Sequence, residues 1–226
     1  MHSLDNPIWQ ALTTRQASLA QSRGQVRRFI PEVSPLGGFA EVSVESYASL
    51  ATLLQPEEKI GLFLHAPPEP PAGWNVVLRG DLLQMVHRGT DGPTSTADVC
   101  ELSREDVPDM IELAHLTKPG PFNARTHELG DYFGIRRNGI LAAMAGERLR
   151  FPGYTEISAV CTHPDHLGHG YATALIGVLM ERICRRKETP FLHVRGDNAR
   201  AIALYERLGF ERRLEYYYAV LCRRAE

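Results

Sequence analysis

Apolar side chains recur every three to four residues in several stretches of the chain, which is the spacing of helices with one buried face. The longest stripe begins near Tyr171 and ends before the cations Arg185 and Arg186, which favour the negative end of a helix dipole. Start and stop residues mark the others: an early proline, a serine or asparagine cap, a terminating glycine. The predicted helices start at Asn6–Pro7, Ser43, Ser103, Tyr171 and Asn198, and the last ends at Gly209.

Other stretches have the composition or the alternation of strands. The strongest signal is the pair Asn138-Gly139 between residues 132–137 and 140–151, which predicts a hairpin. Further strands are expected over residues 59–65, 75–86, 155–164, 190–194 and 214–223. In the strand from Thr155, one face is expected to carry Glu156, Ser158, Val160 and Thr162 unless a bulge intervenes.

A polar stretch with glycine and proline, residues 89–98, separates two patterned regions and is typical of a linker. We therefore predict two domains, 1–90 and 98–226. The first reads as a small α/β module with a proline-rich surface connection at 66–73. Its residues leave two interpretations open: a degenerate copy of the second domain, or a lid and dimer surface.

Composition excludes several classes of protein. The 226 residues are 43% hydrophobic and 23% charged, as in globular domains, and 25 basic against 27 acidic residues give a net charge of −2. No basic field points to a nucleic-acid partner. The four cysteines form no C-x-x-C pair, the amino terminus lacks a signal-peptide pattern, and no apolar window is long enough for a membrane span. We expect reduced thiols, a cytoplasmic location and no membrane partner.

The pair of glycines at 168 and 170 lies between a predicted strand and the longest predicted helix. Glycines let a backbone approach a ligand closely, and the free N–H groups at a helix start attract anions such as phosphate. The pattern is neither a P-loop, because no Gly-Lys-Ser/Thr follows, nor a complete dinucleotide fingerprint, because Thr173 replaces the third glycine. A simpler interpretation is that the glycines only cap the connection.

Two separated segments, AVCTHPDHLGHGYATALI (159–176) and DNARAIALYERLGF (197–210), resemble motifs of the GNAT superfamily of acetyl-CoA-dependent N-acetyltransferases. The resemblance covers about residues 98–223. It implies an α/β fold with a mixed, mostly antiparallel sheet flanked by helices, in which two central strands splay apart to admit the coenzyme. It also implies acetyl transfer from acetyl-CoA to a primary amine by direct transfer in a ternary complex.

The resemblance assigns a coenzyme site residue by residue. The family's pyrophosphate motif, Gln/Arg-x-x-Gly-x-Gly/Ala, falls on the segment that begins at Leu167, where this chain departs from the polar residue of the family. Backbone groups of the preceding strand would pair with the pantetheine arm, and an asparagine would hydrogen-bond it. The implied cofactor-binding residues are Val160, Thr162, Leu167, Gly168, His169, Gly170, Tyr171, Ala172, Thr173 and Asn198.

The same resemblance suggests two catalytic residues. Tyr205 would protonate the departing thiolate, which suits a phenol with a pKa of roughly 10; the alternative is core packing, because Tyr205 shares a helix stripe with Ile202 and Leu208. An amine must lose a proton before it attacks, so a base or a water relay is needed. Glu156 is the first candidate for that base, with a solvated strand residue as the alternative, and Glu147 and His193 are weaker candidates.

Three histidines, His163, His166 and His169, together with Cys161 raise a metal hypothesis, since imidazole and thiolate are common zinc ligands. They lie around the glycine turn, and no H-E-x-x-H accompanies them, so we expect no metal. The expected partner is a small-molecule or peptide amine, and a homodimer is left open. The rival to an enzyme is a non-catalytic acyl-CoA-binding sensor or interaction module.

Overall fold

The computed structural model describes residues 2–89 and 97–224. A small three-stranded sheet contains β1 (Ala20–Arg23), β2 (Val26–Phe29) and β3 (Gly37–Phe39). A second sheet has eight strands in the order β4-β11-β5-β10-β9-β8-β7-β6. Its strands are β4 (Lys59–Leu64), β5 (Trp74–His87), β6 (Cys100–Leu102), β7 (Tyr132–Arg137), β8 (Ile140–Phe151), β9 (Tyr154–Thr162), β10 (Thr189–Arg195) and β11 (Phe210–Arg223).

The predicted fold class is confirmed. Every neighbouring pair in the large sheet is antiparallel except β9 with β10, which run parallel. The helices that flank the sheets are α1 (Pro7–Thr13), α2 (Val44–Ala51), α3 (Val107–Thr117), α4 (Tyr171–Arg185) and α5 (Ala199–Arg207). Among the described residues, no helix is both long and apolar enough to cross a bilayer.

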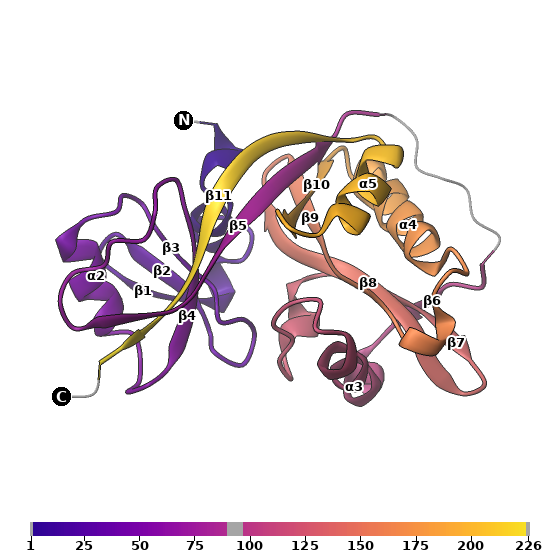
Figure 1. Ribbon diagram of the computed structural model, residues 1–226, viewed down its shortest axis with the longest axis horizontal. Helices are drawn as coiled ribbons and strands as arrows, with labels where there is room; N and C mark the ends of the chain where they lie inside the picture. Colours follow the sequence, from indigo (N-terminus) through magenta and orange to yellow (C-terminus); the bar gives the residue numbers. More distant parts are fainter. Residues whose placement is uncertain (1, 90–96, 225–226) are drawn as a thin grey trace.

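The long strands β5 and β11 run side by side from one lobe of the molecule to the other (Figure 1). β5 belongs to the first half of the sequence, yet it lies between β10 and β11 of the second half. Strands on both sides of the predicted linker therefore share one sheet. Residues 90–96 of that linker lie outside the described residues, and the division into domains 1–90 and 98–226 stays a prediction.

The two halves repeat one pattern of strand pairing. β11, the last strand of the second half, pairs with β4, and β5, the last strand of the first half, pairs with β10. The two last strands then pair with each other. A parallel bridge between Leu36 and Gly61 links the β3 end to β4, as β9 and β10 are linked in parallel. This exchange supports the interpretation of the first half as a shortened copy of the second.

Burial of apolar stripes holds the helices in place. In α4, the stripe Leu175, Ile176, Leu179, Met180 and Ile183 is completely buried against the large sheet. Each such side chain contributes about 1.5 to 3 kcal/mol when it leaves water. On the opposite side, Leu4, Ile8 and Leu12 of the amino-terminal segment pack with strand residues such as Phe151 and Phe191. The first half therefore covers one face of the sheet that carries the second half.

Most local predictions are confirmed, with one correction. Asn138 and Gly139 both have positive φ, 51° and 84°, as the predicted hairpin turn requires. Ser43 Oγ accepts a hydrogen bond from Ser46 N at 3.2 Å and so caps α2. Asn6 precedes α1 as predicted but does not cap it, because its side chain instead donates to the Phe39 carbonyl at 2.7 Å. A tertiary contact replaces the expected local one.

Candidate active site

β9 and β10 part after a short stretch of pairing. Their parallel ladder joins only residues 154–156 to 189–191, ending at Glu156 opposite Phe191. The outer edges of both strands stay paired, β9 with β8 and β10 with β5. Beyond the ladder, the inner edges open as a wedge within the sheet. This is the splay that the family resemblance implied.

A β-bulge at Ala159 coincides with the opening. Ser158 and Cys161 lie opposite Gly146 and Met144, so two residues of β9 face one of β8, and Ala159 has a φ of 53°. The predicted shared face of Glu156, Ser158, Val160 and Thr162 is therefore broken. Val160 packs with the cluster under α4 instead of on the Glu156 face.

The turn before α4 leaves backbone amides free. Gly168 and Gly170 have φ of 83° and 73°, and a Cβ added at either would meet no heavy atom within 4 Å. No side chain caps the helix, and its first internal bond runs from Ala174 N to Gly170 O. The amides of residues 171–173 thus lack acceptors within the helix and face an open approach. Such a terminus attracts anions.

A cation that the sequence did not reveal lies beside this turn. Arg137 Nε donates to the Tyr171 hydroxyl at 3.0 Å, and its guanidinium lies 5.2 Å from the centroid of the Tyr171 ring. Its Nη1 donates to the Arg136 carbonyl at 2.7 Å, and no carboxylate among the described residues pairs with Arg137. His169 stacks on the same ring, at 5.4 Å and 26°. Arg137 precedes the hairpin turn in sequence, so only the tertiary fold brings it to α4.

The three histidines around the turn make local contacts. His163 Nδ1 accepts from Asp165 N at 3.2 Å, and the His166 ring lies 5.8 Å from that of His163. The part of the chain that the structure describes contains no group of three or more His, Cys, Asp or Glu residues arranged to hold a metal ion. Cys161 is buried, and burial raises the pKa of its thiol to about 11. Leu167, by contrast, is 49% exposed at the surface.

The predicted asparagine and tyrosine both lie on the segment of α5. Asn198 Oδ1 caps the helix by accepting from Ala201 N at 3.1 Å, which leaves its amide N–H groups available. Tyr205 is half-buried and packs edge-on against Phe210, with ring centroids 6.0 Å apart. Burial raises the pKa of the Tyr205 phenol to about 12. The phenol therefore stays protonated at neutral pH and has a proton to donate.

Glu156 is buried at the point where the strands part. Arg148 holds it with two hydrogen bonds, Nε to Oε2 at 2.8 Å and Nη2 to Oε1 at 2.5 Å, and His193 Nδ1 lies 2.7 Å from Oε1. Burial alone would raise the pKa of this carboxyl, but the charge of Arg148 and the hydrogen bonds outweigh it, and the pKa falls to about 2. The alternative of a solvated strand residue is wrong.

Two residues of the first half of the chain, Gln84 and Leu4, extend this cluster. Gln84 of β5 lies 3.2 Å from His193 Nε2, and its side-chain nitrogen also donates to the Leu4 carbonyl at 3.0 Å. Burial lowers the pKa of His193, so its ring is neutral at pH 7, with Nδ1–H donating to Glu156. The weaker candidate Glu147 is fully buried and paired with Arg186 and Arg150. It has no free acceptor oxygen to offer a substrate.

Comparison with known proteins identifies the fold. A crystal structure of a putative GNAT acetyltransferase from Novosphingobium aromaticivorans is 38% identical, each chain covers 100% of the other, and the TM-score is 0.90. This chain belongs to the GNAT superfamily of acetyltransferases. The family model described as FR47-like protein also matches, over residues 132–219.

Two further relatives of this GNAT chain are more distant. A ribosomal protein bS18-alanine N-acetyltransferase from Escherichia coli is 29% identical over 128 residues, which span 53% of this chain and 86% of the relative. A tandem GNAT protein from the clavulanic acid biosynthesis pathway is 14% identical, with a TM-score of 0.55 over 86% of this chain and 77% of that one. The latter likeness is one of fold alone.

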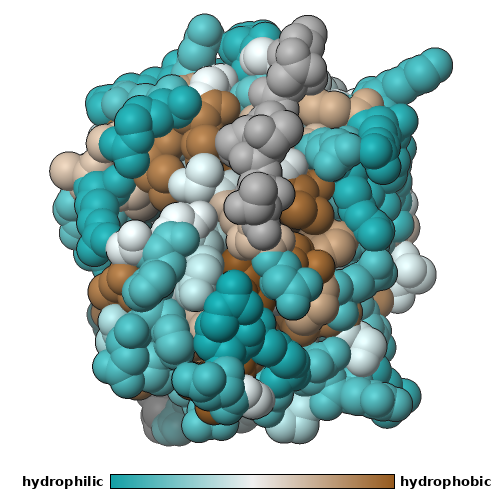
Figure 2. Space-filling model, turned by 90° about the vertical axis from the view of Figure 1, so that its right-hand side faces the viewer, coloured by the Kyte–Doolittle hydropathy of each residue, from teal (hydrophilic) through white to brown (hydrophobic). Residues whose placement is uncertain are grey.

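The surface of the GNAT half is mixed in character. On the face of the molecule that Figure 2 shows, hydrophobic side chains reach the surface in several patches between hydrophilic ones.

The predicted site residues lie on two structural features of this half. Val160 and Thr162 lie at the end of β9 and residues 167–173 form the turn and the start of α4, whereas Asn198 caps α5 and Tyr205 lies within it. Arg137, Arg148 and Gln84 join them only through the tertiary fold.

Proposed function

We propose that this chain transfers an acetyl group from acetyl-CoA to a primary amine by direct transfer in a ternary complex. The observation that carries the proposal is the wedge between β9 and β10, which opens beside an uncapped helix start with an unobstructed glycine turn. An extended arm fits a wedge of unpaired strand edges, and a pyrophosphate fits the free amides. Acetyl-CoA would supply the activated acetyl thioester.

The described residues suit that co-substrate. Amides of residues 167–173 would hold the pyrophosphate, and the backbone of Val160 and Thr162 would pair with the pantetheine arm. Arg137, a cation without a carboxylate partner, would supply the charge that Leu167 lacks. Asn198 keeps amide donors free for the arm.

Two catalytic roles follow from the protonation states. Tyr205 would donate its proton to the thiolate that leaves, because its phenol is protonated at neutral pH. Glu156, with a pKa of about 2, holds a proton poorly by itself. Neutral His193 donates its Nδ1–H to Glu156, but both side chains are fully buried and His193 Nε2 lies 3.2 Å from the Gln84 side-chain nitrogen, so neither offers a free acceptor to the amine. We propose that the amine proton leaves through a water relay that the negative charge of Glu156 favours.

Direct transfer is supported by the state of Cys161. Its thiol lies in β9 but is buried, and its pKa of about 11 keeps it protonated. A buried thiol is a poor nucleophile, so an acyl-cysteine intermediate at this position is disfavoured. The acceptor class is a small-molecule or peptide amine, and the cytoplasmic location and the homodimer also stay predictions.

The second candidate is an acyl-CoA-binding sensor without turnover. One observation favours the sensor. An enzyme of this kind needs a group that takes the amine proton, and Glu156, the first candidate for that base, is held in an ion pair with Arg148. The test is a panel of amines with acetyl-CoA, read by release of free thiol, and it includes a peptide that begins with alanine. Gly170→Glu serves as the control without a coenzyme site. Thiol release with at least one amine supports the enzyme; calorimetric binding without release on any amine supports the sensor.

A further inference from the structure

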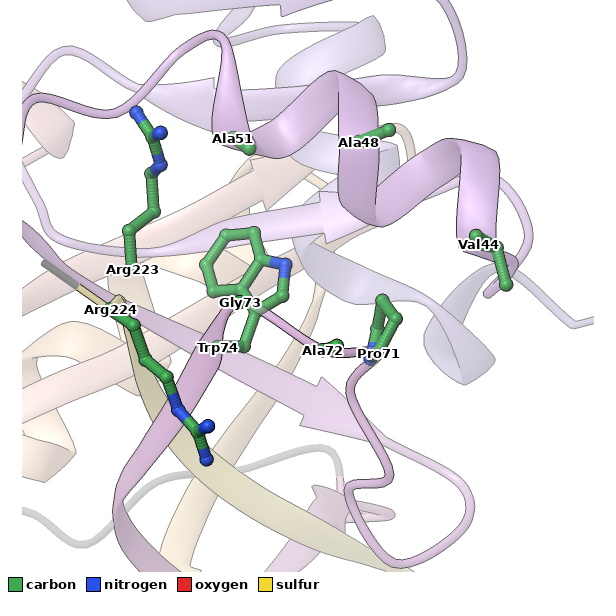
Figure 3. A pocket seen from close by; sticks show the side chains of 9 residues that line it. All are labelled: Val44, Ala48, Ala51, Pro71, Ala72, Gly73, Trp74, Arg223 and Arg224. Atoms are coloured by element: carbon green, nitrogen blue, oxygen red, sulfur yellow. The ribbon is translucent and has the colours of Figure 1, made fainter. Parts of the chain in front are cut away.

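The first half of the chain contains a cavity of about 460 Å³ that the acetyltransferase site does not use (Figure 3). One wall is α2, with Val44, Ala48 and Ala51, and another is the segment 71–74 that leads into β5. The end of β11 completes it with Arg223 and Arg224. This volume is in the range of small-molecule sites in proteins.

The repeat of the fold explains why a cavity exists at this place. In the second half, α5 connects β10 to β11 and covers the sheet beside α4. In the first half, the corresponding connection from β4 to β5 is the proline-rich segment 65–73, which forms no helix. The side of α2 toward this connection is left partly uncovered, and Val44 is 65% exposed.

The lining combines part of an aromatic ring with an unpaired cation. Trp74 is only 7% exposed and is held edge-on by Tyr47, with ring centroids 5.8 Å apart, so a small and fixed part of the indole reaches the cavity. Arg223 is its direct partner across β5 and β11, and the side chains of Arg223 and Arg224 extend in opposite directions (Figure 3). Within residues 2–89 and 97–224, Arg223 has no side-chain hydrogen bond or ion pair, whereas Arg224 Nε donates to Asn75 Oδ1 at 2.9 Å.

We propose that this cavity binds a small aromatic carboxylate. Its ring would lie against the alanines of α2 and the small accessible part of the Trp74 indole, where apolar surface leaves water. Its carboxylate would meet the Arg223 guanidinium, whose fork matches two oxygens, and Arg224 would add positive potential nearby. No acidic residue is among the described residues that line the cavity, so nothing there repels the anion.

The test uses the full chain with Trp9→Phe, which leaves Trp74 as its single tryptophan. Phenylacetate is the probe, and Trp74 fluorescence is the readout. We expect saturable binding with a dissociation constant of roughly 0.1 to 1 mM, which is reasonable for a ligand of about ten heavy atoms. Neutral phenylacetamide should bind at least about tenfold more weakly, since it lacks the charge-assisted contact. The readout is binding alone, so it does not depend on acetyl transfer.

Variants locate the binding. Arg223→Gln should weaken phenylacetate binding about tenfold or more, and Ala48→Phe should abolish it by filling the cavity. Arg79→Gln is the matched control, because Arg79 is an exposed β5 arginine outside the cavity, and it should leave the affinity unchanged. Thermal unfolding of each variant checks that the fold is intact; an unfolded Ala48→Phe protein leaves Arg223→Gln to decide.

Several results overturn the proposal. One is the lack of saturation up to about 10 mM phenylacetate, well above the expected range. Another is equal binding of phenylacetamide, or an unchanged affinity in Arg223→Gln. Tighter binding of ADP than of phenylacetate would assign the cavity to nucleotide phosphates instead. A dimer in sedimentation that dissociates in Ala48→Phe would assign it to a second copy of the chain.

Discussion

Replacement of Glu156 by glutamine should destabilise the protein far more than an ordinary strand substitution. The carboxylate is completely buried, and it accepts two hydrogen bonds from Arg148 and one from His193. Glutamine keeps the size of the side chain but removes its charge. Arg148, whose side chain is 16% exposed, then loses the counter-ion beside it. Loss of one partner of a buried ion pair is among the mechanisms that produce large destabilisation.

The shift of the Glu156 pKa gives the size of the expected loss in the free energy of unfolding. The pKa falls from 4.5 to about 2 in the folded protein. A difference of one unit corresponds to about 1.4 kcal/mol, so the ionised carboxylate contributes roughly 3 kcal/mol to the free energy of unfolding at pH 7. We therefore expect Glu156→Gln to lower that free energy by about 3 kcal/mol, in line with the 3 to 5 kcal/mol known for broken buried pairs.

The pH dependence of the stability difference between wild type and Glu156→Gln tests whether it comes from the ionised carboxylate. Because the folded pKa is below the unfolded one, the stabilisation is complete above pH 4.5 and is lost as pH falls toward 2. Urea unfolding of wild type and Glu156→Gln should therefore give a constant difference from pH 6 to 8 and a shrinking one between pH 4.5 and the acid limit of folding. Comparison of the two proteins cancels the titration of groups that do not contact Glu156, and the same comparison in a His193→Gln background removes the coupled titration of His193.

A matched control separates this effect from glutamine itself. Glu211→Gln removes an exposed strand carboxylate, 71% exposed and 3.8 Å from Arg88, and should change stability by less than about 0.5 kcal/mol. The double variant Glu156→Gln with Arg148→Met also removes the positive charge that the single variant leaves buried without a counter-ion. We expect it to be more stable than Glu156→Gln alone. The reasoning is refuted if Glu156→Gln lowers stability by less than about 1 kcal/mol at pH 7, or if the difference is unchanged at pH 3.

Three further predictions concern the proposed acetyl transfer. Tyr205→Phe should keep the affinity for acetyl-CoA in calorimetry but lower the turnover rate by roughly ten- to a thousandfold, since only the transition state loses its proton donor; an unaltered rate removes Tyr205 from the mechanism. Gly170→Glu should abolish coenzyme binding, because a side chain at a φ of 73° strains the turn and adds negative charge at the helix start; unchanged affinity in calorimetry would move the coenzyme elsewhere. Leu167→Arg should tighten acetyl-CoA binding several-fold at low salt, with a gain that shrinks as salt is raised because exposed charges are screened over roughly 8 to 10 Å. No gain at any salt concentration would mean that position 167 points away from the phosphates.

Short-range signals account for what the sequence predicted correctly. The hairpin at Asn138-Gly139, the cap at Ser43 and the apolar stripe of α4 depend on a few neighbouring residues and on one period of 3.6. The glycine turn and the start of α4 belong to the same class, because the positive φ of Gly168 and Gly170 is a local property. These signals were enough to place the candidate anion site on the chain.

Long-range contacts decided the rest. The alternating pattern predicts Glu156 to be a half-exposed strand carboxylate, yet it is completely buried, with hydrogen bonds to Arg148 and His193. Gln84 in turn contacts His193. The bulge at Ala159 moves Val160 to the other face, because the number of residues on β8 and not the pattern of β9 determines the register. Similarly, Arg137 meets Tyr171 only because the hairpin end lies beside the start of α4.

The sequence by itself determined the helices, most strands and the position of the glycine turn, because these follow from local backbone preferences and from the period of apolar residues. The mixed, mostly antiparallel sheet was expected from the resemblance of two segments to GNAT motifs. It did not determine that β5 lies between β10 and β11, since strand exchange between halves depends on pairings across more than a hundred residues. The tertiary structure alone therefore decided which groups surround Glu156, and these groups keep its carboxyl ionised. The tertiary structure also decided that β11 meets α2 and Trp74 around one cavity.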